Sequence, residues 1–336
     1  MVIFPLSLIS FLFPPAGEVL NFFTIILEQI SLFIARYKIG IIYFSKPSTA
    51  LIIIYYVCII LFLYNKKYIF IFILLLYHKY LAYFNPSFEL AIFDVGQGDS
   101  LFIEYPHNKG NILIDTGGGT NYQIVLENMI PYFRSKGIAS IDYLIISHGD
   151  YDHMGEAINL VENFKVKKVI FNCGELNDLE QELIKVLDKK EISYYSCIKE
   201  LNIDNNILYF LQTKEYDNEN DNSNVIYTEL DGYKFMFMGD AGVDKEKGIL
   251  EKYNISNIDV LKVGHHGSKT SSGKEFIDEI NPKYSVISVG KNNRYGHPNK
   301  EVLNNLEESK IYRTDQDGSI MFKIKNNKLK IETCSP

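Results

Sequence analysis

Two histidines and two aspartates lie close together in the segment Ser147-His-Gly-Asp-Tyr-Asp-His153 of this 336-residue chain. Residues 143–146 are apolar and predict a buried strand before the segment, and the apolar spacing of residues 154–164 predicts a helix after it. Imidazole nitrogens and carboxylate oxygens bind Zn²⁺, Mn²⁺ or Fe²⁺. A loop at a strand end can gather such side chains around one point, so we interpret the segment as a metal site. The weaker alternative is a polar loop that holds these residues by chance.

Two later segments repeat this order of strand, glycine and ligand-capable side chain. The strand predicted at 233–238 leads to Gly239-Asp240, and a short strand at 260–263 leads to Gly264-His-His-Gly267. A third strand, at 111–114, leads to Asp115-Thr-Gly-Gly-Gly119, whose glycines permit close approach of the backbone to the site. No P-loop lysine follows these glycines, so nucleotide binding is not predicted.

Short strands alternate with helices around these segments. We predict strands at 88–93, 100–105, 111–114, 143–146, 167–171, 193–198, 225–230, 233–238 and 260–263, and helices at 122–136, 154–164 and 176–187. Asp231-Gly232 favours a tight hairpin turn between two of the strands. Residues 215–224 are polar and acidic, which is typical of a solvated loop.

The first 85 residues differ from the rest in composition. They hold six basic and two acidic residues, whereas residues 86–336 hold 28 basic and 39 acidic residues, a formal charge of −11. Residues 47–64 are long and apolar enough to cross the roughly 30 Å of a bilayer core, and with residues 68–84 they predict a transmembrane hairpin. Residues 19–35 predict an interfacial segment. We therefore expect a membrane leader, 1–85, before an acidic domain, 86–336.

The charged residues in the leader give opposing indications of its orientation in the membrane. Lys66 and Lys67 in the hairpin turn favour a cytoplasmic tip, which puts the C-terminal domain on the outer face, but Lys46 and Lys79 oppose that orientation.

No CxxC spacing occurs, so neither a zinc knuckle nor a disulfide framework is predicted. We expect unpaired thiols at all four cysteines, namely Cys58, Cys173, Cys197 and Cys334.

The order of these ligand-capable residues resembles the metallo-β-lactamase superfamily. That resemblance implies an α/β fold, an αββα sandwich of two mixed sheets, here preceded by a short α-helical transmembrane leader. More narrowly, the chain resembles the C-terminal domain of ComEC-type competence DNA-uptake proteins, with the end of their membrane channel domain before it. The motifs that carry this resemblance are Asp94-Val-Gly-Gln-Gly-Asp-Ser100, Leu261-Lys-Val-Gly-His-His-Gly-Ser268, Ser288-Val-Gly290, Asn293-Arg-Tyr-Gly-His-Pro298 and Thr314-Asp-Gln-Asp-Gly-Ser319.

The resemblance implies one or two divalent ions, Zn or Mn. His148, Asp150 and a bridging Asp240 would hold the first ion, and Asp152, His153, Asp240 and His265 would hold the second. The superfamily's separate histidine before the Gly-Asp motif is missing, because this stretch reads Asp221-Asn-Ser-Asn224. The first ion is therefore expected to bind more weakly. His266 could replace His265, although the strand-end position favours His265.

Further roles follow from the same resemblance. Asp152 and His297 are the candidate catalytic residues, with His297 protonating the leaving group. The candidates for orienting a ligand or contacting the substrate are Asp99, Asp115, His266, Ser268, Lys269 and Tyr295. Each also has an ordinary interpretation: Lys269 as a solvated charge, Tyr295 as a packing residue, and His297 as a loop residue before Pro298.

The implied function is a membrane-anchored metal-dependent nuclease or phosphodiesterase in DNA uptake. Single-stranded DNA is the expected partner, together with the membrane and a companion channel subunit or other competence proteins; the protein would be multi-pass, with its catalytic domain on the outer face. The acidic domain predicts weak, metal-dependent DNA affinity through a local track, formed by Lys262, Lys269, Lys274, Lys291 and Arg294. One alternative is a metallohydrolase of another small phosphodiester or ester. Another is a non-catalytic fragment of a split channel protein, because the leader has room for only two or three spans.

Overall fold

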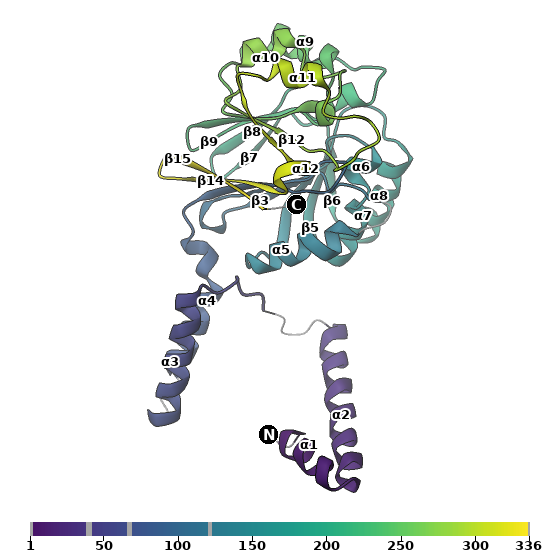
Figure 1. The fold of residues 1–336 in the computed structure, drawn as a ribbon. Helices are drawn as coiled ribbons and strands as arrows, with labels where there is room; N and C mark the ends of the chain where they lie inside the picture. Colours follow the sequence, from purple (N-terminus) through teal and green to yellow (C-terminus); the bar gives the residue numbers. More distant parts are fainter. Residues whose placement is uncertain (1–2, 38–41, 66–68, 120–122, 335–336) are drawn as a thin grey trace. The chain divides into compact units, whose positions relative to one another are not determined.

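The computed structural model describes residues 3–37, 42–65, 69–119 and 123–334. The chain divides into two compact units, Met1–Tyr43 and Phe44–Pro336. The membrane leader predicted at 1–85 and the domain predicted at 86–336 do not coincide with these units, and that boundary stays a prediction. The second unit holds both a pair of apolar helices and all of the strands (Figure 1).

The described part of the first unit forms two helices, α1 (Ile3–Leu12) and α2 (Pro15–Tyr37). Proline at the first helical position suits the start of α2, because its missing N–H would be unpaired there in any case. Pro15–Ile34 is long and apolar enough to cross a membrane, and among the described residues no other helix meets both conditions. The segment predicted to be interfacial lies inside α2, and its relation to a membrane stays a prediction.

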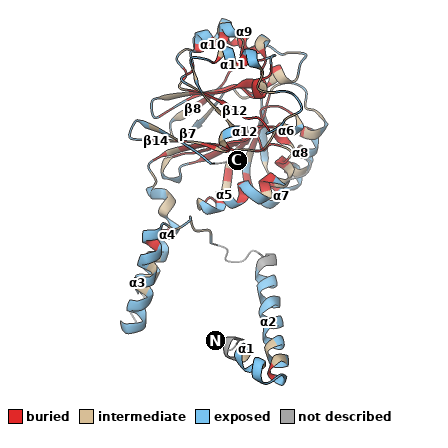
Figure 2. Ribbon diagram, viewed as in Figure 1, coloured by how far each residue is buried: buried red, intermediate tan, exposed pale blue. Residues whose placement is uncertain are grey.

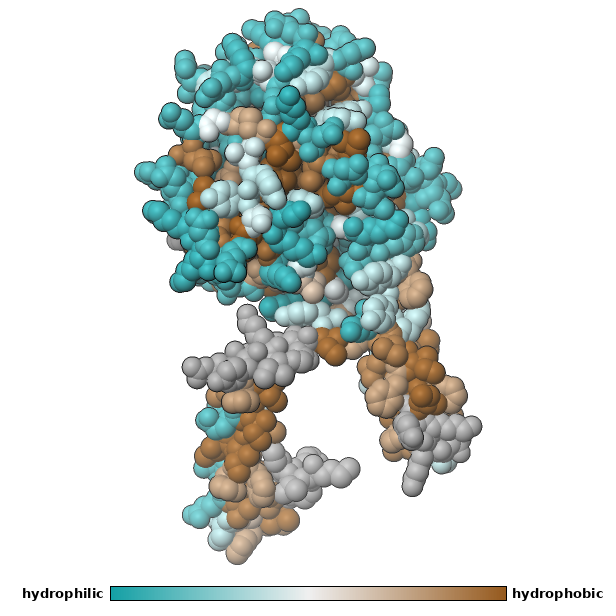
Figure 3. Space-filling model, turned by 180° about the vertical axis from the view of Figure 1, so that it is seen from behind, coloured by the Kyte–Doolittle hydropathy of each residue, from teal (hydrophilic) through white to brown (hydrophobic). Residues whose placement is uncertain are grey.

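A second pair of apolar helices, α3 (Thr49–Asn65) and α4 (Ile69–Lys79), opens the second unit. Hydrophobic residues cover much of their described surface (Figure 3). Tyr55 and His78 join the helices through a 3.1 Å hydrogen bond, and His78 Nε2 lies 2.7 Å from the Ser45 carbonyl oxygen. At about 1.5 Å per residue, the 17 residues of α3 span about 25 Å. The transmembrane hairpin therefore stays a prediction, and Lys66 and Lys67 lie outside the described residues.

Two mixed sheets form the centre of the second unit. The first has the order β15-β14-β1-β2-β3-β4-β5-β6, and the second β13-β12-β11-β10-β9-β8-β7. The strands of the first sheet are β1 (Phe88–Ile92), β2 (Leu101–Glu104), β3 (Asn111–Ile114), β4 (Ser140–Ile145), β5 (Lys165–Phe171), β6 (Ser193–Ser196), β14 (Ile320–Lys325) and β15 (Lys328–Thr333). Those of the second sheet are β7 (Glu200–Ile203), β8 (Asn206–Phe210), β9 (Ile226–Leu230), β10 (Tyr233–Phe237), β11 (Val260–Lys262), β12 (Tyr284–Ile287) and β13 (Lys310–Arg313).

Helices cover the outer face of each sheet (Figure 1). On the first sheet lie α5 (Ile130–Ser135), α7 (Ala157–Asn163) and α8 (Asp178–Lys189); on the second lie α9 (Val243–Lys252), α10 (Lys274–Ile280) and α11 (Lys300–Asn305). The short helices α6 (Tyr151–Met154) and α12 (Thr314–Asp317) follow strand ends. One hydrophobic core lies between the sheets and one lies under each helical layer (Figure 2). This αββα sandwich confirms the predicted fold.

Two local expectations need correction, and one hairpin was not expected. The helix predicted at 154–164 is broken, because α6 ends at Met154 and α7 begins at Ala157. The hairpin β7–β8 was not predicted. Residues 215–224 are not simply a solvated loop, because Asp221, Ser223 and Asn224 are buried against the ends of β4 and β10.

The prediction of four unpaired thiols is also wrong. Cys173 and Cys197 form a disulfide, whereas Cys58 and Cys334 are free. Adjacent parallel strands explain the pairing, because β5 pairs with β6 up to Phe171 and Ser196, and each cysteine follows its strand by one or two residues. The disulfide therefore joins two neighbouring strand ends.

Candidate metal centre

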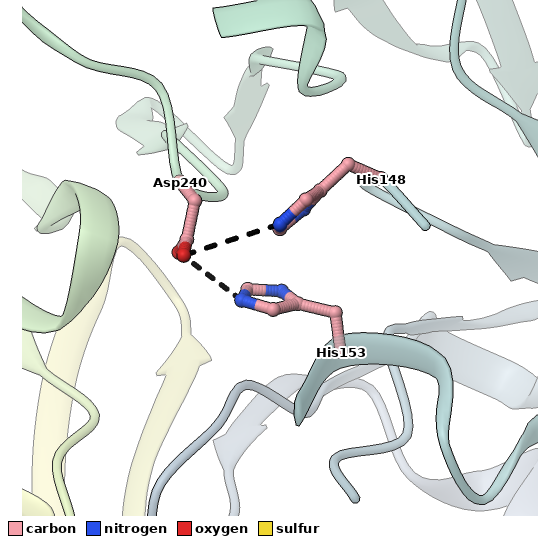
Figure 4. Close-up of side chains that lie close together, drawn as sticks. All are labelled: His148, His153 and Asp240. Atoms are coloured by element: carbon pink, nitrogen blue, oxygen red, sulfur yellow. Dashed lines mark ion pairs between the residues drawn. The ribbon is translucent and has the colours of Figure 1, made fainter. Parts of the chain in front are cut away.

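The ligand-capable residues gather where strands of both sheets end. β4 leads to the segment Ser147–His153, while β10 and β11 of the other sheet lead to Asp240 and to the pair His265-His266. Figure 4 shows His148 and His153 pointing at Asp240 from the opposite side. Asp240, His148, His153 and His266 are all buried. The site thus lies across the seam between the two sheets.

Each of the four histidines is held through Nδ1, which leaves Nε2 directed at Asp240. His153 Nδ1 lies 2.9 Å from Asp115 Oδ2, and His266 Nδ1 lies 3.0 Å from the Ser288 carbonyl oxygen. His148 Nδ1 lies 3.0 Å from Ser147 Oγ, and His265 Nδ1 lies 3.1 Å from Thr270 Oγ1. Such contacts orient the imidazole ring and fix its tautomer.

The partners determine where the protons lie. A carboxylate and a carbonyl oxygen can only accept, so His153 and His266 donate from Nδ1. Ser147 Oγ lies 2.6 Å from Asp115 Oδ2 and gives it its only proton, so it accepts from Nδ1 of His148. In the neutral form, these three rings therefore present an Nε2 lone pair, which is the form that binds a metal.

Asp240 has one carboxylate oxygen for each pair of histidines. Its Oδ1 lies 3.1 Å from His153 Nε2 and 3.6 Å from His266 Nε2. Its Oδ2 lies 3.7 Å from His265 Nε2 and 4.0 Å from His148 Nε2. Asp150 adds an oxygen 3.4 Å from His148 Nε2, and Asp152 adds one 3.2 Å from His266 Nε2.

These spacings fit a divalent ion. Two ligands that each lie about 2.1 Å from a tetrahedral zinc are about 3.4 Å apart. The Nε2 atoms of His148, His153 and His266 and Oδ1 of Asp240 are buried without a hydrogen-bond partner among the described residues. Buried polar atoms rarely stay unpaired. Combinations with ligand atoms within 4.8 Å of one another are His148-His153-Asp240, Asp152-His153-His266, Asp99-Asp240-His266 and Asp99-Asp115-His153.

The charges of the cluster's own side chains shift its pKa values strongly. Burial lowers the pKa of His266, but Asp240, Asp152 and Asp99 outweigh this and raise it to about 10. Burial also lowers the pKa of His153, but Asp240 and Asp115 outweigh this and raise it well above its ordinary value. Burial raises the pKa of Asp240, yet the neighbouring histidines bring it well below its ordinary value. The carboxylates thus demand positive charge, which protons or metal ions can supply.

Asp99 and Lys262 form a buried ion pair beside this cluster. Lys262 Nζ lies 2.6 Å from Asp99 Oδ2, and Asp99 Oδ1 lies 3.5 Å from His266 Nδ1. Lys262 is therefore not available as part of a DNA track, which corrects that prediction. Lys274 is exposed but pairs with Asp278 at 3.1 Å.

Close backbone contacts hold the ligand segment in place. A Cβ atom at Gly98 would lie 2.2 Å from the Asp152 carbonyl oxygen, and one at Gly118 would lie 1.9 Å from that of Tyr151. Asp99 N–H donates to the Asp152 carbonyl at 3.1 Å. Gly118, one of the glycines predicted to allow close approach, thus packs against the ligand segment itself, and so does Gly98, for which no such prediction was made.

The predicted substrate-contacting residues lie at the edge of the cluster. The His297 ring lies 6.0 Å from that of His265 and stacks on Tyr295 at 5.6 Å. Tyr295 and Lys269 are exposed, whereas Ser268 is buried and lies 3.0 Å from the Thr270 hydroxyl. These positions surround the histidine pair, and their contacts with a substrate stay predictions.

Sequence reasoning missed several supporting residues. Ser147 links Asp115 to His148, Ser288 holds His266, and Ser223 accepts a 3.2 Å hydrogen bond from Asp240 N–H. Asn224 donates from its side chain to the Ile146 carbonyl at 2.9 Å. Ser147 directly follows a predicted strand, and Ser288 begins the motif Ser288-Val-Gly290, so the sequence did offer a signal for these two residues. Ser223 and Asn224 lie in the loop that was interpreted as solvated.

The fold and this site define the class of the protein. The sequence profile of the metallo-beta-lactamase superfamily matches residues 93–291, and the chain belongs to that superfamily. Within it, the chain is 36% identical over 257 residues to ComE operon protein 3 of Bacillus subtilis, a match that covers 71% of this chain and 33% of that protein. It is 29% identical over 247 residues to competence protein ComA of Neisseria gonorrhoeae, covering 70% of this chain and 33% of that protein.

A third relative is recombination protein 2 of Haemophilus influenzae, 27% identical over 254 residues, which cover 74% of this chain and 30% of that protein. The resemblance to ComEC-type competence proteins is therefore confirmed. The chain spans about a third of the length of these relatives.

Proposed function

We propose that this chain is a metal-dependent phosphodiesterase that cleaves a DNA strand in competence-type DNA uptake while its apolar helices hold it at a membrane. The observation that carries the proposal is the convergence of four oriented Nε2 atoms on the two oxygens of Asp240. The homology to competence proteins supports DNA as the substrate and DNA uptake as the setting.

We assign the ligands to two sets that share Asp240, and within each set every member lies 4.0 Å or less from at least one other member. One set is His148, Asp150, His265 and Oδ2 of Asp240; the other is Asp152, His153, His266 and Oδ1 of Asp240. This division gives His265 to the first set, whereas the sequence resemblance assigned it to the second. Zn²⁺ or Mn²⁺ bound there would lower the pKa of a water to near neutrality and offset charge on a phosphodiester.

The remaining residues act on the substrate from the exposed side. Asp150 and Asp152 have side chains that are 46% and 33% exposed, so the site opens past these two carboxylates. Lys269, an exposed residue three positions after His266, is our candidate for contacting a phosphate oxygen. His297, which stacks on Tyr295, is the candidate for passing a proton to the leaving oxygen.

Two features support a membrane position with the catalytic domain on the outer face. The helix α2 contains 20 consecutive residues apolar enough to cross a bilayer, and α3 and α4 are also apolar. Disulfides persist mainly in oxidising compartments, and Cys173–Cys197 lies in the catalytic domain. A companion channel subunit or other competence proteins would complete the uptake system.

The test is metal-dependent hydrolysis by the full chain in detergent micelles. Protein freed of metal by EDTA and dialysis is supplied with Mn²⁺, Zn²⁺ or Mg²⁺ and assayed on single-stranded DNA, duplex DNA and bis(p-nitrophenyl) phosphate. We expect cleavage of single-stranded DNA, lost by about a hundredfold or more in Asp240→Asn, because changes even to the partners of metal ligands cost 10–100-fold. Asp188→Asn, on the exposed face of α8, is the matched control.

Two outcomes would redirect the proposal. Cleavage of the small diester without cleavage of DNA would favour a metallohydrolase of another small phosphodiester or ester. Absence of metal binding would support the non-catalytic alternative and remove both enzymatic functions.

A further inference from the structure

A cavity of about 280 Å³ lies on the far side of the 222–225 segment from the metal-ligand cluster. The end of β8 supplies Phe210 and Leu211, and the disulfide Cys173–Cys197 lines another part. Lys214 and Lys245 line it as well. Its size is close to the lower end of small-molecule sites, about 300 Å³.

Lys245 is a buried cation without a counter-charge in direct contact. Its exposed fraction is 4%, and it forms no ion pair within 4 Å and no side-chain hydrogen bond among the residues that the structure describes. Its ammonium lies 5.6 Å from the centre of the Tyr216 ring, and Lys214 lies 5.0 Å from the same ring. The side chain is buried while its unpaired ammonium reaches the cavity that it lines, so this position favours an anion.

The nearby acid does not neutralise Lys245 by contact. Asp221 Oδ1 accepts a 2.7 Å hydrogen bond from Gly242 N–H, and its Oδ2 accepts from Asn218 at 3.4 Å. Lys245 also lies in the first turn of α9, where the helix dipole disfavours a positive charge. Burial lowers the pKa of Lys245 to about 8, as expected for an ammonium without an adjacent partner.

The cavity and the metal-ligand cluster have one wall in common. Asn222, Ser223 and Asn224 line the cavity. On the other side, Ser223 Oγ accepts from Asp240 N–H at 3.2 Å, and Asn224 N–H donates to the Ser147 carbonyl at 2.8 Å. A ligand in the cavity would therefore sit one short segment away from the residues that hold Asp240 and His148.

We propose that this cavity binds a phosphate group of a nucleotide, with Lys245 as its buried counter-charge, Lys214 at its mouth and Phe210 and Leu211 against the apolar part of the ligand. The identity of the ligand rests on the proposed function, under which a DNA strand and its cleavage products are present at this domain. The phosphate could belong to the DNA strand itself or to a released mononucleotide, and both present the same chemistry to Lys245.

The test measures binding without metal, so it does not depend on catalysis. The full chain in detergent with EDTA is titrated with a fluorescent 5′-phosphorylated oligothymidylate, thymidine monophosphate and inorganic phosphate. Lys245→Met should weaken binding about tenfold or more, as expected for a lost hydrogen bond between charged groups. Lys283→Met is the matched control, because Lys283 is an exposed lysine that also lies over a tyrosine ring; it should change binding less than twofold.

The pattern among the three probes identifies the source of the phosphate. Tight binding of the oligonucleotide alone points to the strand, and binding of thymidine monophosphate points to a released product. Equal losses in Lys245→Met and Lys283→Met, or no binding of any probe, would overturn the proposal. Metal-dependent hydrolysis in the same preparation reports separately on the proposed function.

A second measurement guards against misfolding of the variant. Lys245→Met replaces an unpaired buried charge with an apolar group, so its thermal midpoint without ligand should equal or exceed that of the parent. The parent should gain thermal stability with the probe that binds, and Lys245→Met should gain none at the same concentration. A gain of equal size in both proteins would contradict a role for Lys245.

Discussion

The Ser147 hydroxyl lies 2.6 Å from Oδ2 of Asp115 and 3.0 Å from Nδ1 of His148. The hydroxyl donates to Asp115 and accepts from His148. Through this hydroxyl, the Asp115 carboxylate helps to orient the His148 ring. Without this hydroxyl, the His148 ring could rotate and change tautomer.

We therefore predict that Ser147→Ala weakens binding of the first metal ion by about 10–100-fold. Competition with a fluorescent zinc chelator measures this loss in the full chain. Ser193→Ala, an exposed position on β6, is the control and should bind metal as the parent does. Unchanged affinity in Ser147→Ala would show that the serine does not orient His148.

Substitution of His265 and substitution of His266 should affect metal binding alike but stability differently. His265→Ala and His266→Ala should each lower the bound metal from about two ions to about one, measured by elemental analysis after dialysis. His266→Ala should also destabilise the metal-free protein by about 1–3 kcal/mol, because the Ser288 carbonyl oxygen loses its buried donor. The His265 side chain is 27% exposed, so its removal should leave that stability nearly unchanged. Equal destabilisation by both changes would contradict this division.

Removal of the disulfide should lower the free energy of unfolding by about 3 kcal/mol, because the unfolded chain is then no longer restricted by the closed loop between the two cysteines. The cysteines are 24 residues apart. Cys173→Ser should show this loss in urea denaturation without reductant, and reductant should produce the same loss in the parent. Cys334→Ser, at an exposed free cysteine, should have no effect. Insensitivity of the parent to reductant would argue against the bond.

Glu246 should make stability depend on pH. Its carboxylate accepts hydrogen bonds from Ser272 and Gly273 N–H, but burial prevails and raises its pKa from 4.5 to about 7. The folded state then binds more protons than the unfolded state between these values, so the free energy of unfolding falls as pH rises from about 4.5 to 7. The full effect is about 3 kcal/mol, since each pKa unit corresponds to about 1.4 kcal/mol.

Glu246→Gln should remove this dependence. Chemical denaturation of metal-free protein at pH 5 and pH 8 measures it, and the variant should lose less stability than the parent over that interval. Glu251→Gln, an exposed change on the same helix, should keep the parent's dependence. The same slope in parent and Glu246→Gln would show that another group titrates.

Much of the fold could be predicted because its signals are local. The apolar runs that became β3, β9 and β10 each end in a glycine or a polar side chain, and the structure starts and stops these strands within about a residue of the predicted limits. The predicted helix 176–187 is α8, whose Asn177 caps its N-terminus through a reciprocal contact with Glu180.

The parts that could not be predicted depend on contacts between distant segments. Whether His265 or His266 faces Asp152 depends on the Ser288 carbonyl and the Thr270 hydroxyl, and the sequence does not place these atoms. The disulfide required the parallel register of β5 and β6. Lys262 resembled a surface charge until the fold buried it against Asp99, 163 positions away.

The two sheets supply different halves of the metal-ligand cluster: His148 and His153 follow β4 of one sheet, and Asp240 and the histidine pair follow β10 and β11 of the other. Neither half alone presents either of the two ligand sets that share Asp240. The site is therefore not modular, and a fragment or permuted chain that lets the sheets separate would lose it even where each sheet still folds. We therefore expect the folded sandwich and metal binding at the site to be gained or lost together.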